Sequence, residues 1–164
     1  MYYFSLILIA VLTAADQVVK FFVDKYIPLN KVIDVIHFGD TKIFSLTHIR
    51  NSGAAWSMMS GKTWFLIALP IVVCGVALFY MYKIRNTKKL EMFSISLFVA
   101  GGIGNLIDRI RLHEVIDYIR FEPIDFPIFN FADICVVVGV ILFAVSLFFD
   151  EKKDKNEVES KNNG

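Results

Sequence analysis

The stretch Thr63–Tyr82, TWFLIALPIVVCGVALFYMY, decides the fold class of this chain. It contains no charged side chain, and its length is about that which an α-helix needs to cross the hydrocarbon core of a bilayer. Pro70 and Gly75 lie inside it, but membrane helices tolerate both because neighbouring groups satisfy the loosened backbone. We therefore predict a transmembrane helix over residues 63–82.

Three further apolar runs lie around this stretch, at about residues 3–23, 92–109 and 130–149. A cleaved signal peptide is the alternative for the first run. No Lys or Arg precedes that run and three more runs follow, so we expect a retained helix. Hydrophobic residues make up 56% of the 164 residues, which is rare in a soluble domain. The sequence predicts an all-α membrane protein with four transmembrane helices in a single domain, residues 1–150.

Basic residues indicate the orientation of these helices. The connection after the second run and the C-terminal tail contain eight of the 17: Lys83, Arg85, Lys88, Lys89, Lys152, Lys153, Lys155 and Lys161. Short cytoplasmic segments carry an excess of Lys and Arg, so we expect both segments, and both termini, in the cytoplasm. The tail at 151–164 is polar and charged, and we predict that it is disordered.

The other two connections then lie outside the cytoplasm. The first covers about residues 24–62, and partial apolar alternation over 31–38 and 43–49 predicts a hairpin or small sheet. The second, residues 109–129, contains Pro123 and Pro127. The predicted fold is thus four transmembrane helices with a small extracytoplasmic β segment.

Polar side chains gather where the predicted helices meet the outer membrane face. The topology brings seven of them to this depth: Asp16, Lys20, Asn105, Asp108, Arg109, Asn130 and Asp133. Asp117 lies in the outer connection between the last two helices. Ionisable groups at membrane depth are costly, so their default interpretation is functional. Because the whole set lies near one face of the membrane, an active site is favoured over separate structural roles.

Local structural roles remain open for single members of this set. Asp16 and Lys20 have the spacing and order of a stabilising helical ion pair. Asn130 and Asp133 have the spacing of a helix N-cap and the third helical residue, where the helix dipole stabilises a carboxylate.

Neither the cysteines nor the histidines suggest a metal or disulfide site. Cys74 and Cys135 lie inside apolar runs and are interpreted as small hydrophobic residues. His37, His48 and His113 are scattered and lack the spacing of a zinc site. The net charge of +1 gives no support to nucleic-acid binding.

Carboxylates are therefore the candidates for acid–base chemistry. Asp117 and Asp133 are separated by a loop long enough to bring them together. Two carboxylates in a partly dry site cannot easily both ionise, so one keeps a proton while the other accepts one. Such a pair can activate water and protonate the leaving amine of a peptide bond, and the sequence leaves open which aspartate is the base. Asn51, Asn105 and Arg109 are candidates for orientation and oxyanion stabilisation.

Other classes of protein fit less well. Ser52 and Ser57 lie near His48, but no nucleophile elbow is present, and we expect His48 to be a loop residue near the interface. A proton-coupled transporter would need polar groups through the whole membrane depth. A non-enzymatic assembly protein would use the glycines and polar groups only to pack its helices.

Five short blocks resemble one known family. In chain order they are DQVVK at 16–20, RNSGAAW at 50–56, GNLIDR at 104–109, VIDY at 115–118 and FNFAD at 129–133. Together they resemble the lipoprotein signal peptidases, also called signal peptidase II, which are bacterial intramembrane aspartyl proteases. Ile116 and Tyr118 stand where this family often has Val and Phe, and these exchanges keep the apolar or aromatic character.

The resemblance implies that Asp117 and Asp133 are the catalytic pair. It implies supporting or substrate-binding roles for ten further residues: Asp16, Lys20, Asn51, Gly53, Gly104, Asn105, Asp108, Arg109, Asn130 and Ala132. Members of the family cut before the lipid-modified cysteine of a diacylglyceryl-prolipoprotein, without a cofactor or metal.

The expected partners are therefore lipid-modified prolipoprotein signal peptides and membrane lipid, and no nucleic acid. The expected location is the bacterial plasma (inner) membrane, with the active site near the outer face. The loop with Trp56 and the nearby Trp64 are expected at the interface, where the loop could cover the cleft.

Overall fold

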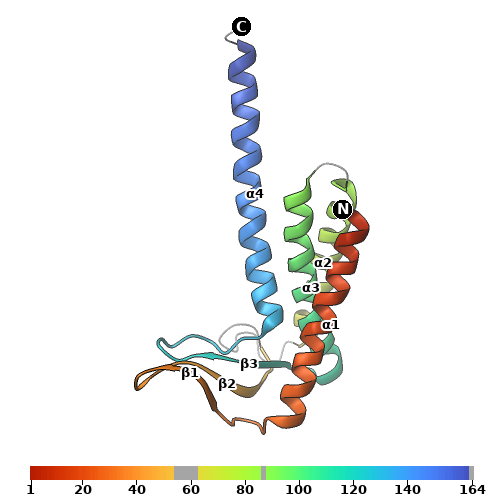
Figure 1. The fold of residues 1–164 in the computed structure, drawn as a ribbon. Helices are drawn as coiled ribbons and strands as arrows, with labels where there is room; N and C mark the ends of the chain where they lie inside the picture. The colour runs from red at the N-terminus through yellow and green to blue at the C-terminus, as the bar shows by residue number, and fades with distance from the viewer. Residues whose placement is uncertain (54–62, 86–87, 163–164) are drawn as a thin grey trace.

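Four helices and a three-stranded sheet make up the computed structural model, which describes residues 1–53, 63–85 and 88–162 (Figure 1). The helices are α1 (Tyr2–Tyr26), α2 (Thr63–Lys83), α3 (Lys89–Leu112) and α4 (Phe131–Asn162). The strands are β1 (Ile33–Phe38), β2 (Thr41–Asn51) and β3 (Val115–Phe121). All four helices are long and apolar enough to cross a membrane, which confirms the predicted fold class.

Helix α3 lies at the centre of the helical bundle and contacts each of the other three helices. In its most apolar window 56% of the residues are buried, compared with 28% or less in the other helices. Gly101 and Gly139 allow α3 and α4 to approach closely. A Cβ atom on Gly101 would lie 2.2 Å from the carbonyl oxygen of Ala132. Small residues at such contacts are typical of membrane helices.

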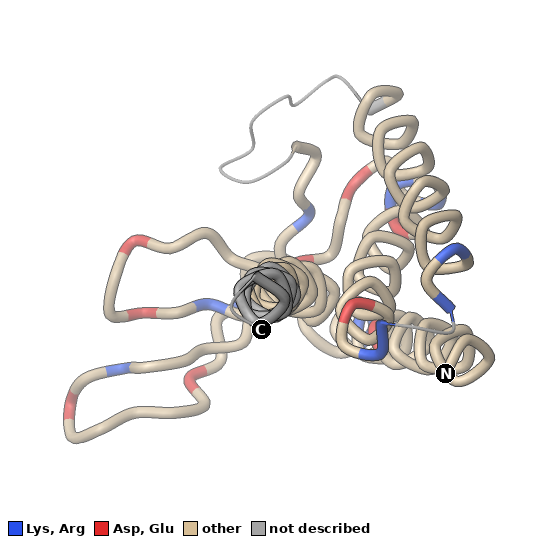
Figure 2. The backbone as a smooth tube through the Cα atoms, turned by 90° about the horizontal axis from the view of Figure 1, so that it is seen from above, with Lys and Arg blue, Asp and Glu red and all other residues tan. Residues whose placement is uncertain are grey.

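The sheet is antiparallel, in the order β1-β2-β3, and lies at one end of the helices (Figure 1). We call this the sheet end of the bundle, and the end where α2 finishes and α3 begins the far end. Viewed from above, the strands project to the side of α4 that faces away from α1 (Figure 2). The hairpin of β1 and β2 confirms the predicted β segment.

Strand β3 was missed by the sequence interpretation, which treated residues 109–129 as a connection with prolines. Its residues VIDYIRF are mostly β-branched or aromatic, which is typical of a strand. Asp117 pairs with Ile49 of β2, and Val115 pairs with Asn51. The strand therefore carries a candidate catalytic residue into the sheet.

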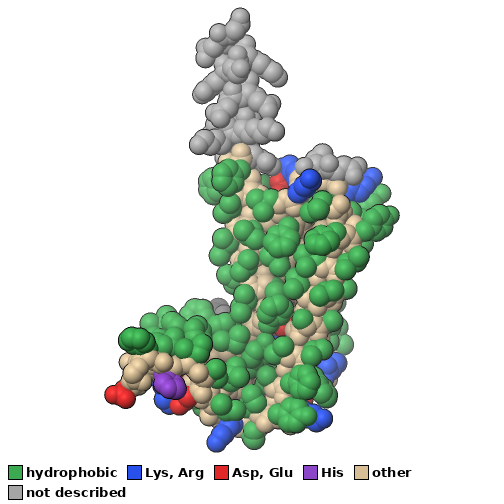
Figure 3. Space-filling view, in the orientation of Figure 1, with side chains coloured by type: hydrophobic (Ala, Val, Ile, Leu, Met, Phe, Trp, Pro, Cys, Tyr) green, Lys and Arg blue, Asp and Glu red, His purple; other side chains and the backbone are tan. Residues whose placement is uncertain are grey.

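Hydrophobic side chains cover the flanks of the helices, whereas Lys and Arg lie towards the two ends (Figure 3). Phe79 of α2 is 63% exposed and Phe148 of α4 is 74% exposed. An apolar surface of this extent requires a non-aqueous environment. This distribution agrees with helices that are surrounded by lipid.

Two helix ends differ from the predictions. Helix α3 continues past residue 109 to Leu112 and ends at His113, which adopts a left-handed conformation with φ 61°. Helix α4 continues to Asn162, although we predicted disorder over 151–164. Lys and Glu are good helix formers, and residues that extend an existing helix avoid the cost of nucleation. Trp56 and Ser57 lie outside the described residues, while Trp64 stands at the start of α2 and is 72% exposed.

Candidate active site

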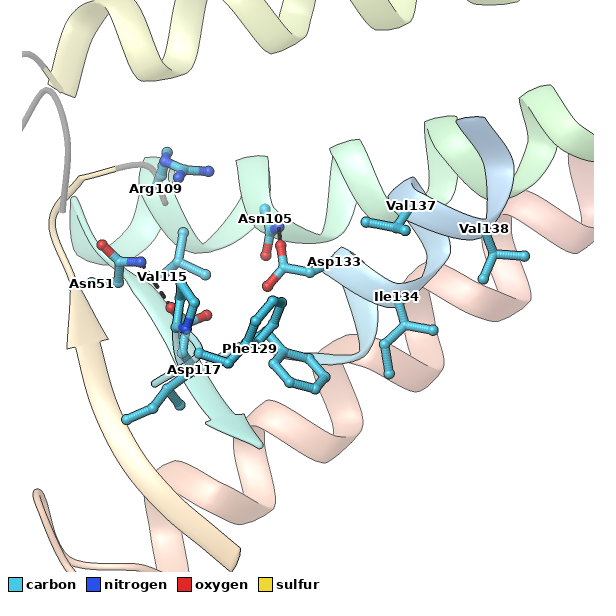
Figure 4. Close-up of a pocket in the computed structure, with 13 residues that line it drawn as sticks. Asn51, Asn105, Arg109, Val115, Asp117, Phe129, Asp133, Ile134, Val137 and Val138 are labelled. Carbon is cyan, nitrogen blue, oxygen red and sulfur yellow. Dashed lines mark hydrogen bonds between the residues drawn. The ribbon is translucent and has the colours of Figure 1, made fainter. Parts of the chain in front are cut away.

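A cavity of about 550 Å³ opens at the sheet end, between α3, α4, the strands and the segment before α4 (Figure 4). Among the described residues, five polar side chains line it: Asn51, Asn105, Arg109, Asp117 and Asp133. The remaining lining residues are apolar. The structure thus brings both predicted catalytic aspartates, which we call the aspartate pair, to one cavity.

Asp117 is buried in β3, with 3% of its surface exposed. Its Oδ2 accepts a hydrogen bond from Asn51 Nδ2 at 2.8 Å, and its Oδ1 accepts one from Asn130 Nδ2 at 2.7 Å. Burial, followed by the negative charge of Asp133, raises the pKa of Asp117 to about 7. Asp117 can therefore hold a proton near neutral pH.

Asp133 lies in the first turn of α4. The backbone N–H of Asn130 donates to Asp133 Oδ2 at 3.0 Å, and the backbone N–H of Asp133 donates to Asn130 Oδ1, also at 3.0 Å. This reciprocal arrangement is a capping box, and it confirms the predicted N-cap. Asn105 Nδ2 donates to Asp133 Oδ1 at 2.7 Å. Asp133 is therefore held by two hydrogen-bond donors at the N-terminus of α4.

A buried ionic cluster lies beside the aspartate pair. Lys20 Nζ is 3.0 Å from Asp16 Oδ2 and 2.8 Å from Asp108 Oδ2, and all three side chains are about 1% exposed. Lys20 Nζ also donates to Asn105 Oδ1 at 2.9 Å. The predicted helical ion pair is confirmed, and the third contact connects it to the site.

Both acids of this cluster also bind the backbone next to the aspartate pair. Asp16 Oδ1 accepts the backbone N–H of Ala132 at 3.1 Å, and Asp108 Oδ2 accepts that of Ile116 at 3.3 Å. Ala132 immediately precedes Asp133, and Ile116 immediately precedes Asp117. The cluster therefore fixes the backbone at the residue before each member of the pair.

Small residues permit these close contacts. A Cβ atom on Gly104 would lie 2.6 Å from Asp16 Oδ2, and Ala132 is fully buried. The backbone N–H of Gly53 donates to Asn51 Oδ1 at 3.0 Å, and its carbonyl accepts Arg109 Nη2 at 3.0 Å. All twelve predicted site residues thus lie in or directly beside the site.

Two contributors were missed by the sequence interpretation. Gln17 Nε2 donates to Asp108 Oδ1 at 3.2 Å and to the carbonyl of Gly104 at 3.0 Å. The hydroxyl of Tyr118 accepts the backbone N–H of Phe131 at 3.2 Å, and burial raises the pKa of that hydroxyl to about 12. Gln17 follows Asp16 in a motif block, and that position was the available signal. Nothing local in the sequence indicated that Tyr118 reaches α4.

The prediction that His48 is a loop residue is wrong. His48 lies in β2, where it is 2% exposed and its Nδ1 is 2.8 Å from the carbonyl oxygen of Ile27. Its Nε2 accepts Arg50 Nε at 3.3 Å. Cys74 and Cys135 are buried and free, as their apolar surroundings indicated. Within the described part of the chain, no group of three or more His, Cys, Asp or Glu side chains is arranged to hold a metal ion.

Comparison with known proteins gives a consistent result. Residues 8–149 match the family model described as signal peptidase (SPase) II. A lipoprotein signal peptidase of Lactiplantibacillus plantarum is 38% identical over 92% of this chain and 97% of its own length. One of Streptococcus thermophilus is 41% identical over 87% of this chain and 91% of its own length.

A solved structure also matches closely. It is described as a bacterial membrane enzyme and superposes with a TM-score of 0.84 at 32% identity, over 91% of this chain and 90% of that one. The family model covers most of the chain, and the curated relatives cover nearly all of it. This chain therefore belongs to the signal peptidase II family of membrane peptidases.

Proposed function

We propose that this protein is an intramembrane aspartyl endopeptidase that removes the signal peptide from diacylglyceryl-modified prolipoproteins. It cuts before the lipidated cysteine. One observation carries the proposal: Asp117 and Asp133 line the same cavity, and each is held by two hydrogen-bond donors. The curated relatives are named lipoprotein signal peptidases, which supports this class of substrate.

The chemistry uses one ionised and one protonated aspartate. The ionised carboxylate takes a proton from water, and the water oxygen bonds to the scissile carbonyl carbon. The protonated carboxyl gives its proton to the carbonyl oxygen, so a neutral tetrahedral diol forms. When the C–N bond breaks, the amine takes the proton held by the first aspartate. The second aspartate recovers its proton from a diol hydroxyl.

Arg109 lines this cavity and supplies a cation beside the aspartate pair. Its guanidinium lies near enough to Asp117 and Asp133 for their charges to interact, and its Nη2 bonds to the carbonyl of Gly53. A cation in this position stabilises negative charge that develops on the scissile carbonyl oxygen. This role agrees with the expectation from the sequence.

The apolar part of the cavity suits a substrate that stays in the bilayer. Phe126, Phe129, Ile134 and Val137 line it beside the aspartate pair. A second cavity of about 310 Å³ lies farther along the bundle between α2, α3 and α4, and its exposed lining is wholly apolar. These surfaces fit the apolar helix of a signal peptide and the acyl chains on its cysteine.

The location follows from the distribution of basic residues. Lys83, Arg85 and Lys89 lie at the far end, and the positive-inside rule places that end in the cytoplasm. Both termini are then cytoplasmic, and the site lies near the outer face of the bacterial plasma membrane. Membrane lipid surrounds the helices.

The test uses the full chain purified in lipid or detergent, with a lipidated prolipoprotein and its unlipidated form as substrates. We expect cleavage of the lipidated form only, and loss of cleavage in Asp117→Asn and in Asp133→Asn. Asp34→Asn is the matched control, because Asp34 is an exposed aspartate in the same sheet, paired with Lys42 at 2.9 Å. Full activity of either the Asp117→Asn or the Asp133→Asn variant would refute the mechanism. Ion transport without proteolysis would favour a transporter.

A further inference from the structure

Three asparagine amides connect the aspartate pair to its surroundings. An amide can present either its oxygen or its NH₂ group, and the two orientations have nearly the same shape. A neighbour that can only donate settles the choice, because it must face the oxygen. That neighbour therefore decides whether the amide turns its NH₂ group or its oxygen towards the carboxylate on its other side.

Backbone N–H groups settle two of the three amides. Gly53 N–H donates to Asn51 Oδ1 at 3.0 Å, so Asn51 Nδ2 faces Asp117. Asp133 N–H donates to Asn130 Oδ1 at 3.0 Å, so Asn130 Nδ2 also faces Asp117. These donors belong to the main chain and do not depend on any side chain.

The third amide, that of Asn105, is held by side chains. Its Oδ1 accepts Lys20 Nζ at 2.9 Å and Asn130 Nδ2 at 3.1 Å, and its Nδ2 donates to Asp133 Oδ1 at 2.7 Å. An ammonium group carries three donors and no acceptor, so Lys20, together with Asn130 Nδ2, holds the oxygen of Asn105 on the side away from Asp133. Asp133 thereby receives an N–H group and not an oxygen.

The two carboxylates are unequal in their other surroundings. Asp117 is buried in a strand, whereas Asp133 is partly exposed to the cavity at the N-terminus of α4. Ionisation costs less where burial is smaller and where a helix N-terminus supplies positive potential. The N–H group that Asn105 donates also stabilises negative charge on Asp133.

We propose that Lys20 is a positioning residue: it orients the amide of Asn105 and so makes Asp133 the ionised, water-activating member of the pair. Asp117 is then the member that carries the proton. The inference rests on the proposed function, and it assigns the two roles in the reaction described there. Asp133 takes the proton of the attacking water and passes it to the leaving amine, while Asp117 protonates the carbonyl oxygen and is reprotonated by the diol.

Replacement of Lys20 by glutamine tests the inference. A glutamine amide can accept as well as donate, so of these two donors only Asn130 Nδ2 still holds the oxygen of Asn105, and that oxygen turns towards Asp133 more easily. An oxygen in that position favours protonated Asp133, which cannot activate water. We expect kcat to fall ~10–100-fold with little change in KM, and the acid limb of the kcat profile to move about one unit to higher pH.

Other charged groups face the aspartate pair and also influence the pH dependence of kcat. Asp16 and Lys20 lie on α1, and Asp108 and Arg109 lie on α3. The charge of Lys20 also acts directly on Asp117 and favours its ionised form. A direct effect of this kind does not require Asn105.

A double-mutant cycle separates these effects. Asn105→Ala, Lys20→Gln and the double variant are compared. Glu91→Gln is the control for loss of an ion pair with one buried partner, and Glu91 lies at the far end of α3, the helix that carries Asn105. If Lys20 acts through Asn105, Lys20→Gln has little further effect on kcat or on the acid limb in the Asn105→Ala background. Equal losses in both backgrounds, or an unchanged pH profile in Lys20→Gln, would overturn the inference.

Folding and the proposed function are checked in the same experiment. If Lys20→Gln does not fold, Asp16→Asn/Lys20→Gln replaces it, because this variant removes one charge of each sign and keeps an oxygen for the N–H of Ala132. Equal losses in both Asn105 backgrounds, or an unchanged pH profile in this variant, would then overturn the inference. An unmodified protein without cleavage would contradict the proposed function itself, whereas an active protein with an additive cycle would contradict only the role of Lys20.

Discussion

The two ends of the helical bundle both contain buried carboxylates, but the charges are balanced differently. At the far end, Glu91 is 1% exposed, with its Oε1 2.7 Å from Lys88 Nζ and its Oε2 bonded to the hydroxyl of Tyr80 at 2.6 Å. This carboxylate has its own cation and a further donor. Its contacts tie the end of α2 to the start of α3.

Around the aspartate pair, the carboxylates among the described residues outnumber the cations. Lys20 and Arg109 face four acids: Asp16, Asp108, Asp117 and Asp133. Lys20 is shared between Asp16 and Asp108, so within the described part of the chain the cations do not balance the charges of the aspartate pair. Burial then favours a proton on one of the pair. A surplus of acids over cations, more than burial itself, therefore distinguishes the candidate active site from a structural ion pair.

The largest expected difference between the two ends is in catalysis. Asp117→Asn should reduce cleavage by roughly 10²–10⁴-fold, the scale of an essential acid or base. Glu91→Gln should change cleavage little, because Glu91 lies at the other end of α3. Both effects are measured as rates of cleavage of the lipidated substrate. Thermal unfolding of each variant checks that it is folded. Similar losses in the two variants would remove the distinction.

The pH dependence of stability should also differ. The pKa of Asp117 is about 7 in the folded protein, above its ordinary value of 3.8, so the folded state binds more protons between these values. Stability contributed by this group is therefore present below about pH 4 and is lost as the pH rises towards 7, by on the order of a few kcal/mol. Asp117→Asn should lack this loss.

Thermal midpoints measured from pH 4 to pH 8 test this expectation. The midpoint of Asp117→Asn relative to the unmodified protein should rise with pH across this window. Glu91→Gln is the control, and its difference from the unmodified protein should not follow the same curve. A constant difference for Asp117→Asn would show that its carboxyl has the same affinity for protons in the folded and unfolded states.

Packing of α3 against α4 holds the sheet end together. Gly101→Ala would place a Cβ 2.2 Å from the carbonyl of Ala132, next to the aspartate pair, and should cost ~1–3 kcal/mol or more. Gly75→Ala in α2 is the matched control, since its Cβ would meet nothing within 4 Å. That change should be neutral or stabilise by up to ~1 kcal/mol. Equal thermal midpoints in the two variants would refute close packing as the role of Gly101.

The smallest expected effect concerns two tyrosine hydroxyls. Tyr118→Phe removes the acceptor for the N–H of Phe131 at the start of α4, and Tyr80→Phe removes the donor to Glu91. Each should cost ~1 kcal/mol. Cleavage should slow modestly in Tyr118→Phe alone, because Phe131 lies two residues before Asp133. A slower Tyr80→Phe enzyme would mean that the far end influences the site.

Local patterns in the sequence determined much of this protein. The four apolar runs predicted the helices, because the hydrocarbon core requires long uninterrupted apolar segments. The ion pair of Asp16 and Lys20 and the capping box of Asn130 and Asp133 were also predictable. In each case the partners lie three or four residues apart, and helix geometry alone brings such residues together.

Only the tertiary structure decided how the site is connected. Asn51 reaches Asp117 because β2 pairs with β3, and Lys20 reaches Asn105 because α1 packs on α3. These partners are 66 and 85 residues apart. No local periodicity encodes such distances, since they depend on register and on the close approach that Gly104 permits. The sequence by itself thus identified the aspartate pair, and long-range packing set the donors and the charge that surround each carboxylate.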